Sequence, residues 1–373
     1  MLRIGYDAYP LFNNFTGPGN YSRTLIKQLT DFHPEAAYFL YASEVTRNEE
    51  TRFFLNSAMV NVQMPRQRPV FLWRFFGLRR QLRLHRIQLF HGLDGRLPLR
   101  LPRRLRSVVT IHDMAFRRFP EFYSRLERRL WDFHLASACR RADRIVAISE
   151  HTRQDIIEFY GIDPEKIRVI YQSVNERYMV EKAPKALRHA AKRYELPEQY
   201  LLYVGAVTQR KNLLSAVQAL ASLPPQDRLP LVIIGKGDGY RQKILEYARN
   251  HQLEDFLLFR QPGFDDMPAV YQKATAFIYP SLYEGFGIPV LEALFSRIPV
   301  ITSNRSSLPE AGGDAALLVD PTDPEALGEA IQRILKHSDL REQMIERGFQ
   351  HAQKFRGEAL AGQMFELYRK LTE

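Results

Sequence analysis

Short apolar runs alternate with amphipathic stretches from one end of the chain to the other. The apolar runs are strand-sized and mostly continuous, and the stretches between them repeat apolar positions with helical spacing. This pattern is typical of parallel sheets covered on both faces by helices. The predicted strands are residues 2–8, 38–42, 60–64, 88–92, 107–112, 144–149 and 168–174, then 200–205, 231–235, 256–260, 276–280, 299–303 and 316–319. No apolar run approaches the roughly 18 residues that span a bilayer.

Two series of strands and helices in one chain of 373 residues predict an α/β protein with two doubly wound, Rossmann-like domains. Strand-like sequence ends near residue 173 and a polar stretch follows. We therefore expect an N-terminal domain over residues 1–175, a C-terminal domain over 176–355 and a closing helix over 356–373. Open parallel sheets bind ligands beyond the carboxyl ends of their strands, so we expect a ligand cleft between the two domains.

The net charge of +11 is confined to the first half of the chain. Residues 1–175 contain 28 Lys and Arg against 17 Asp and Glu, whereas the remaining residues contain 25 of each. Such a basic half predicts a polyanionic partner or an anionic membrane surface. No recognised nucleic-acid motif is present, so nucleic acid is not expected as a partner.

The cysteine content and the N-terminus predict where the protein works. A single cysteine, Cys139, permits no internal disulfide and suits a reducing compartment. Asp7 stands where a signal peptide would be apolar. We expect a cytoplasmic protein that reaches a membrane only peripherally, from its inner face.

The most informative segment, residues 281–293, reads SLYEGFGIPVLEA and directly follows a predicted strand. Glu284 and Glu292 offer two carboxylates, with Gly285 and Gly287 leaving backbone amides open to close approach near a helix N-terminus. Carboxylates form charge-assisted hydrogen bonds with hydroxyl groups. The segment therefore predicts a site for sugar or ribose hydroxyls, although a surface-loop acid is the simpler alternative.

A second segment, YVGAVTQRKN, ends a predicted strand at Gly205 and places two cations before a helix that Asn212 can cap. Arg210 and Lys211 at a helix N-terminus suit a diphosphate, but alone they also fit a solvated turn. The loop that begins at Gly235 has a tyrosine at the third glycine position of a dinucleotide fingerprint, so a hydride-transfer cofactor is poorly supported.

Polar residues at strand ends in the first half are further candidates. His112 and Asp113 end a predicted strand, where they are placed either to contact a ligand or to form structural hydrogen bonds. Gly17 and Gly19 lie in a loop after the first strand, before a helix predicted over residues 21–32, and provide either backbone donors or only a tight turn. No cluster has metal-ligand spacing and no nucleophile elbow appears, so we expect no metal and no cofactor.

An arginine-rich stretch, residues 69–86, has the profile of a basic amphipathic helix. Such a helix can lie on an anionic membrane or meet a lipid-linked substrate. It fits equally well a helix packed on the sheet with its arginines in water. The candidate membrane or acceptor patch is Arg74, Arg79, Arg80 and Arg83.

Taken together, the motifs resemble those of the retaining family 4 glycosyltransferases of the GT-B fold, especially bacterial mannosyltransferases of surface polysaccharide synthesis. TGPGNYSRTL, VTIHD, RIVAISEHTRQDI, YVGAVTQRKN and YEGFGIPVLEA occur in the family's order across nearly the whole chain. The resemblance implies a nucleotide-diphosphate sugar, with GDP-mannose favoured, as donor and a glycan or lipid-linked acceptor. It also implies a last helix that crosses back onto the first domain.

The resemblance further assigns roles to the candidate residues. Arg210 and Lys211 would neutralise the departing diphosphate in place of a metal, and Glu292 would hold the ribose. Glu284, with the amides of Phe286 and Gly287, would hold the donor sugar. The remaining members of the predicted donor site are Gly205, Gly235 and Gly285.

In the first domain, the resemblance would bring His112 to the reacting carbon and Gly17–Gly19 to the phosphates or the acceptor, with Asp113 nearby. Pro18 departs from the family's pattern because it lacks an amide hydrogen. Two other functions stay open: an epimerase or phosphorylase of the same fold, and a binding-only paralogue at a membrane surface.

Overall fold

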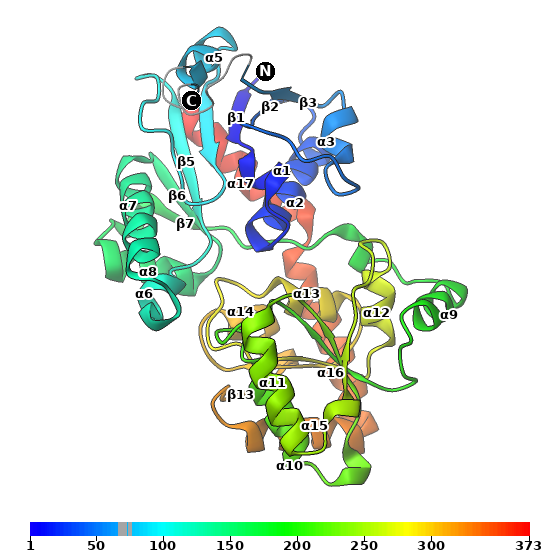
Figure 1. Ribbon diagram of the computed structural model, residues 1–373. Coiled ribbons are helices and arrows are strands. Elements are labelled where there is room, and N and C mark those ends of the chain that lie inside the picture. The colour runs from blue at the N-terminus through cyan, green and yellow to red at the C-terminus, as the bar shows by residue number, and fades with distance from the viewer. Residues whose placement is uncertain (66–72, 74–76) are drawn as a thin grey trace. The chain divides into compact units, whose positions relative to one another are not determined.

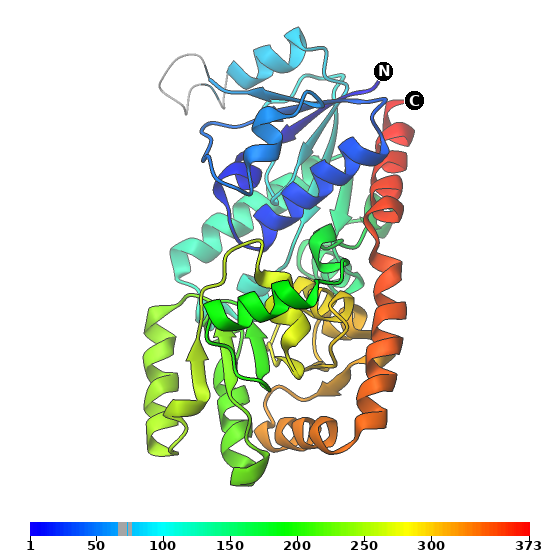
Figure 2. The same cartoon turned by 90° about the vertical axis from the view of Figure 1, so that its right-hand side faces the viewer.

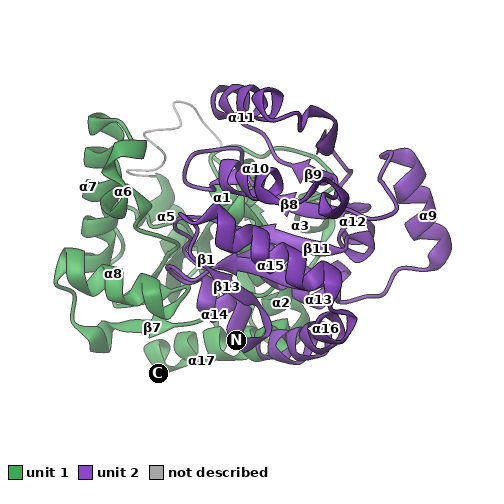
Figure 3. Ribbon diagram, turned by 90° about the horizontal axis from the view of Figure 1, so that it is seen from below, with its two compact units in different colours: residues 1–173, 355–373 green, residues 174–354 purple. Residues whose placement is uncertain are grey.

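The computed structural model describes residues 1–65, 73 and 77–373, and these form two compact units (Figure 3). Unit 1 comprises Met1–Ser173 together with Phe355–Glu373, and unit 2 comprises Val174–Lys354. Each unit is built on its own parallel sheet with helices packed on both faces (Figure 1). The predicted pair of doubly wound α/β domains is confirmed.

The sheet of unit 1 has the strand order β3-β2-β1-β4-β5-β6-β7, and every pair of neighbours is parallel. Its strands are β1 Arg3–Asp7, β2 Ala37–Tyr41, β3 Val60–Gln63, β4 Leu89–Gly92, β5 Arg106–Ile111, β6 Arg144–Ala147 and β7 Ile167–Val169. β7 is shorter than predicted, because its ladder with β6 ends at Ile170, whose N–H donates to Ala147 O. Both chain termini lie at the same end of this unit (Figures 1 and 2).

The helices described in unit 1 cover two faces of that sheet. They are α1 Tyr9–Asn13, α2 Gly17–Phe32, α3 Arg52–Asn56, α5 Leu78–Leu84, α6 Ala115–Arg118, α7 Arg125–Arg141, α8 Glu150–Tyr160 and α17 Gly357–Thr372. Strand β2 shows why both faces are apolar: Tyr38 and Leu40 point into one core, and Phe39 and Tyr41 point into the other. Continuous apolar strands thus bury side chains on both sides.

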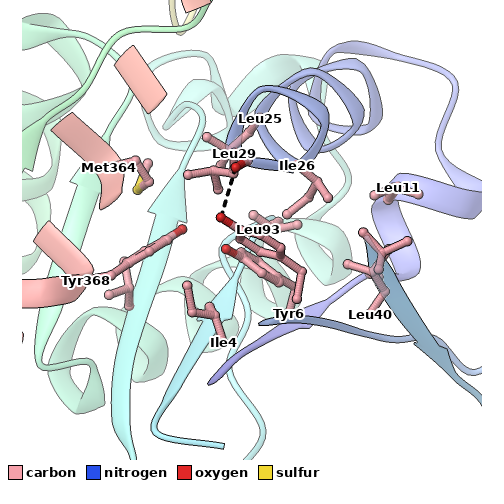
Figure 4. Packing of buried hydrophobic residues seen from close by; sticks show 14 of the residues in the cluster. Ile4, Tyr6, Leu11, Leu25, Ile26, Leu29, Leu40, Leu93, Met364 and Tyr368 are labelled. Atoms are coloured by element: carbon pink, nitrogen blue, oxygen red, sulfur yellow. Dashed lines mark hydrogen bonds between the residues drawn. The ribbon is translucent and has the colours of Figure 1, made fainter. Parts of the chain in front are cut away.

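The first core joins the beginning of the chain to its end (Figure 4). Tyr6 of β1 packs there with Ile26 of α2 and with Met364 and Tyr368 of α17. The Tyr368 hydroxyl also lies 2.6 Å from Nδ1 of the buried His91 in β4. The last helix therefore belongs to the core of unit 1, as the resemblance implied.

The second core lies under α5, α7 and α8. Leu82 of α5, Cys139 of α7 and Ile156 of α8 pack there against the opposite face of the sheet. Burial raises the pKa of the Cys139 thiol to about 12, so this cysteine is a packed apolar side chain.

The sheet of unit 2 has the order β10-β9-β8-β11-β12-β13 and is also entirely parallel. Its strands are β8 Leu201–Val204, β9 Leu231–Ile234, β10 Leu257–Phe259, β11 Ala276–Tyr279, β12 Val300–Ser303 and β13 Leu317–Val319. Its helices are α9 Pro184–Arg193, α10 Leu213–Ser222, α11 Asp238–Asn250, α12 Met267–Lys273, α13 Ile288–Phe295, α14 Leu308–Gly312, α15 Pro324–Lys336 and α16 Ser338–Ala352. Helix α10 packs against α15, and α13 packs against α16.

The helices share one further property. Among the residues that the structure describes, none forms a helix with both the length and the hydropathy needed to cross a membrane.

Candidate active site

In unit 2 the direction of strand addition reverses between β8 and β11. Strands β8 to β10 extend the sheet to one side and β11 to β13 extend it to the other. Ligands of doubly wound sheets bind at the carboxyl ends of the strands beside such a reversal. The segment after β8 carries Arg210 and Lys211, and the segment after β11 carries Glu284. The topology thus brings both predicted motifs to one sheet edge.

The two motifs meet in a cluster of three charged side chains. Lys211 Nζ lies 2.5 Å from one carboxylate oxygen of Glu284, and Arg210 Nη1 lies 3.5 Å from the other. Arg210 Nη1 also donates to the carbonyl oxygen of Tyr283 at 2.6 Å. The backbones are joined as well, since Leu282 N donates to Arg210 O at 2.9 Å. The structure therefore brings the predicted diphosphate residues and Glu284 into one cluster.

The electrostatics of this cluster favour an ionised Glu284. Burial alone raises the pKa of its carboxyl, but the charges of Lys211 and Arg210 outweigh that effect and hold the pKa below its usual value. Two cations facing one carboxylate leave a formal excess of one positive charge. A buried site with that excess suits an anionic ligand.

Tyr279, the last residue of β11, was missed by the sequence reasoning. Its hydroxyl accepts a hydrogen bond of 2.8 Å from Lys211 Nζ, so the ammonium group is held between a carboxylate and a phenol. The signal was present, because Tyr279 is a polar residue at the carboxyl end of a strand. The sequence prediction places Tyr279 in a strand and gives it no role in the site.

The loop before α13 is fixed by the backbone conformation of Gly287 and by two serine hydroxyls. Gly287 has φ +118°, and a Cβ at this position would lie 2.8 Å from Leu308 Cδ2, so glycine is required. Ser307 Oγ donates to the carbonyl oxygens of Glu284 and Phe286, and Glu284 N donates to Ser306 Oγ. The amide of Glu284 is thus already used within the protein.

Glu292 lies in α13 rather than in the charged cluster. Its Oε2 accepts a 2.8 Å hydrogen bond from the Tyr271 hydroxyl, and Tyr178 supplies another. Burial raises the pKa of Glu292 to about 7, with those hydrogen bonds and the charge of Arg177 acting in the opposite direction. These three partners were also missed, because they are distant in sequence.

The glycines at the ends of β8 and β9 have a packing role. A Cβ on Gly235 would lie 1.8 Å from the carbonyl oxygen of Gly205, so the two loops approach backbone to backbone. Gly205 N donates to Ile234 O at 2.9 Å. This contact explains both glycines without a ligand, and their place in a donor site stays a prediction.

The prediction that Asn212 caps α10 with its side chain is wrong. Asn212 occupies the cap position, but its side-chain amide donates to the carbonyl oxygens of Pro280 and Pro321. Its backbone is left-handed, with φ 56°, whereas side-chain capping needs an extended residue. Asn212 instead ties the β8 and β11 segments together.

In unit 1, His112 directly follows β5 and has partners on both ring nitrogens. Nε2 lies 2.8 Å from the carbonyl oxygen of Leu93, and Nδ1 lies 3.2 Å from the Gln172 amide nitrogen. A proton on Nε2 donates to the Leu93 carbonyl oxygen, and Nδ1 then accepts from the Gln172 amide. A ligand contact through Nδ1 would have to replace Gln172.

The remaining candidates of unit 1 occupy helix ends. Gly17 and Gly19 lie in the first turn of α2 and not in a loop, because the helix begins four residues earlier than predicted, with Pro18 in its first turn. A Cβ on Gly19 would lie 1.6 Å from the carbonyl oxygen of Asn14, whereas Gly17 meets nothing within 4 Å. Asp113 Oδ1 accepts a hydrogen bond from Ala115 N, the first residue of α6.

The candidate arginine patch lies partly outside the described residues. Arg74 lies outside them, as do most of residues 69–76. Arg79, Arg80 and Arg83 lie in α5, with Arg80 and Arg83 exposed. Leu78 and Leu82, which belong to the apolar face predicted to meet either a membrane or the sheet, are buried in the second core. That part of the helix therefore packs on the core, with Arg80 and Arg83 in solvent and Arg79 partly buried.

Comparison with known proteins identifies the family. Residues 15–178 match the family described as Glycosyltransferase Family 4, and residues 186–351 match Glycosyl transferases group 1. O-antigen chain mannosyltransferase B of Escherichia coli is 30% identical over 99% of this chain and 100% of its own length. The chain is a family 4 glycosyltransferase.

Solved structures show the fold. A glycosyltransferase from Rickettsia africae ESF-5 aligns with a TM-score of 0.79 at 17% identity, covering 100% of this chain and 99% of its own. Anabaena Alr3699/HepE in complex with UDP-glucose aligns with a TM-score of 0.77 at 16% identity, covering 100% of both chains. The glycosyltransferase thus has the GT-B fold, as the resemblance implied.

Proposed function

We propose that this glycosyltransferase moves a mannose residue from GDP-mannose to a glycan or lipid-linked acceptor of a surface polysaccharide, with retention at the anomeric carbon. The observation that carries the proposal is the cluster of Arg210, Lys211 and Glu284 at the strand reversal of unit 2. The choice of mannose rests on the relative from Escherichia coli, whose name states an O-antigen mannosyltransferase. Unit 2 would bind the donor, and unit 1 the acceptor.

The cluster suits the electrostatic demand of glycosyl transfer. The bond between the anomeric carbon and the phosphate oxygen breaks, and its electron pair leaves with the nucleotide diphosphate. Negative charge therefore grows on the diphosphate in the transition state. Preorganised cations at that point stabilise the transition state more than the bound substrate. Arg210 and Lys211 would supply this charge without a metal.

Glu284 would serve two partners at once. A carboxylate has about four lone-pair sites on its two oxygens, so the bond to Lys211 leaves sites for hydroxyl groups of the sugar. The amides of Phe286 and Gly287 and the nearby Gly285 would complete this side. Glu292 would accept hydrogen bonds from the ribose hydroxyls in place of those from Tyr271 and Tyr178.

The glycines and the residues of unit 1 complete the proposed site. Gly205 and Gly235 would let the nucleotide approach the backbone closely. His112 would contact the sugar near the reacting carbon, and Asp113 with the α2 terminus at Gly17 and Gly19 would face the phosphates or the acceptor. The amino end of a helix favours anions, although Pro18 supplies no N–H.

A transfer assay tests this proposal. The purified chain is incubated with a mannose-terminated oligosaccharide and either GDP-mannose or UDP-glucose, and nucleotide release and the anomeric configuration of the product are measured. We expect release from GDP-mannose and an α-linked product. Transfer from UDP-glucose alone would overturn the choice of donor, and a β-linked product would overturn retention.

The Lys211→Ala variant addresses the site itself. We expect a loss of turnover of about 100- to 1000-fold, the usual cost of removing one preorganised charge. Lys243→Ala, at an exposed position of α11, is the matched control and should retain wild-type turnover. Equal turnover of the two variants would exclude the proposed role of the cluster.

A further inference from the structure

Helix α7 of unit 1 carries apolar side chains on two opposite faces. One face packs into the second core through Leu135, Ala138 and Cys139. A surface helix ordinarily buries one apolar face in the core and exposes a polar face to water. The second apolar face of α7 therefore calls for an explanation.

That second face is open to solvent. Leu126, Leu130 and Phe133 are 68%, 51% and 61% exposed. Their spacing of four and three residues places them in one row along the helix. Single exposed apolar residues are ordinary, whereas a contiguous row of three large ones marks an interaction surface. Helix α7 lies at the periphery of unit 1 (Figures 1 and 3).

The charges beside the row are mainly positive. Arg125, Arg129 and Arg140 are exposed on the same helix. The two acids of α7 are already engaged, because Glu127 closes the capping box with Ser124 and Asp132 is paired with Arg117. Within the part of the chain that the structure describes, neither Arg125 nor Arg129 has a side-chain hydrogen bond or ion pair. The row is thus flanked by available positive charge.

The surface continues at the C-terminal end of α7. A hollow of about 570 Å³ lies there, lined by Arg141 and by the segment before β5, including Leu99, Arg103 and Arg104. Leu99 is exposed, and so are both arginines. Arg141 holds this segment by donating to the carbonyl oxygens of Pro98 and Leu97. Exposed apolar and basic side chains are therefore also present at the end of the helix.

We propose that this side of α7, with the hollow at its end, is a docking surface for an anionic phospholipid bilayer. Leucine and phenylalanine side chains would enter the interface between headgroups and acyl chains, and the arginines would face lipid phosphates. Docking of a second copy through the same face would bring the arginines of both together. A nucleic acid would pair with the arginines but leave the apolar row in water. A bilayer satisfies both components.

Vesicle sedimentation of the full-length protein tests the proposal. One set of vesicles is pure phosphatidylcholine, and the other contains about 30 mol% phosphatidylglycerol. The test variant is Leu130→Ser/Phe133→Ser, whose positions are exposed and so do not support the core. The matched control is Leu84→Ser in α5, which is 67% exposed. Circular dichroism verifies that all three proteins are folded.

We expect the wild type to bind the anionic vesicles and to be released by salt. The double variant should partition at least about tenfold less, because two large apolar side chains no longer enter the interface. The Leu84→Ser variant should bind like the wild type. Equal binding of the double variant and the wild type would overturn the proposal, as would equal binding to neutral vesicles.

Sedimentation velocity without lipid tests whether a second copy of the chain covers this face instead of a bilayer. A wild-type dimer that the double variant no longer forms would assign the face to a second copy and overturn the bilayer proposal. A monomer in both cases supports it. The readouts do not depend on the donor sugar, so failure of the transfer assay would leave this test intact.

Discussion

The ammonium group of Lys211 is held at a defined point by two unlike partners. Glu284 supplies charge at 2.5 Å, and the Tyr279 hydroxyl supplies direction at 2.8 Å. A lysine side chain has four rotatable bonds, so one contact alone would leave its position variable. The tyrosine thereby acts as a positioning residue for the proposed diphosphate contact.

Tyr279→Phe tests that positioning. Removing one hydrogen bond to a charged group should lower kcat by about 5- to 30-fold, with a smaller change in the KM of the donor. Tyr200→Phe is the control, since Tyr200 is equally buried and donates to the carbonyl oxygen of Val270. Steady-state kinetics of both variants decide the matter: losses of equal size would indicate only a general effect on the sheet.

Glu292 gives the protein a pH-dependent stability. Burial raises its pKa from 4.5 to about 7, so between these pH values the folded protein holds a proton that the unfolded chain has released. This contribution to stability is present at low pH and is lost as the pH rises through that range. Above pH 7 the carboxyl is ionised, and burial of this charge destabilises the folded protein.

Glu292→Gln should therefore be more stable than the wild type at pH 8. The difference should grow by at most about 1.4 kcal/mol per pH unit from pH 4.5 to 7 and then stay constant. Thermal unfolding across this range measures it, with Glu342→Gln on the exposed face of α16 as control. A difference that does not change with pH would show that the carboxyl is not held in its neutral form.

At the residue scale, sequence reasoning found the charged groups but not their partners. Arg210, Lys211 and Glu284 were predictable because each follows a strand and strand ends share an edge. Tyr271 and Tyr178 could not be assigned to Glu292, because nothing local links residues so far apart along the chain. The predicted capping role of Asn212 was wrong because the residue type alone does not reveal a backbone with positive φ.

Among the elements, the loop and helix after β11 form the part on which the site depends most. The turn into α13 needs Gly287 with φ +118°, and Ser307 holds two carbonyl oxygens of the loop. Loop and helix together set the position of Glu284.

Gly287→Ala should destabilise unit 2 by about 2–3 kcal/mol. The new methyl group would adopt an unfavourable backbone conformation and collide with Leu308. Gly239→Ala in α11 is the control, because a Cβ there meets nothing within 4 Å and alanine favours a helix. Chemical denaturation of both variants gives the comparison, and equal midpoints would show that the turn tolerates a side chain.

Element types and order were predictable because apolar periodicity reports them directly. Boundaries were less so. Helix α2 begins at Gly17 and not at residue 21, because its first turn contains glycines and a proline that carry no apolar periodicity. Of the apolar face expected for residues 69–86, Leu78 and Leu82 lie among the described residues, and only packing could decide whether they face a core or a membrane.

In the molecule as a whole, the chain returns to unit 1 after completing unit 2. Helix α17 buries Ala361, Met364 and Tyr368 in the core that contains β1 and α2. The stability of unit 1 therefore depends on the last residues of the chain.

Met364→Asp tests this dependence. A charge placed in that core should cost at least about 3 kcal/mol and expose β1 and α2. Gln363→Asp, one residue earlier on the exposed side of α17, should have little effect. Hydrogen exchange localises the result: faster exchange in β1 and α2 is expected, with unit 2 unchanged. If β1 and α2 exchanged at the same rate in Met364→Asp as in Gln363→Asp, a shared core would be contradicted.

The measurement that tests the central claim most directly is the affinity of the full-length protein for GDP, determined by calorimetric titration. We expect a Kd in the micromolar range for the wild type and for Lys243→Ala. Lys211→Ala, checked by thermal unfolding to be folded, should bind at least about tenfold more weakly, because a charge-assisted contact to the diphosphate is lost. A folded Lys211→Ala variant with the wild-type Kd would contradict the assignment of this cluster to the nucleotide diphosphate.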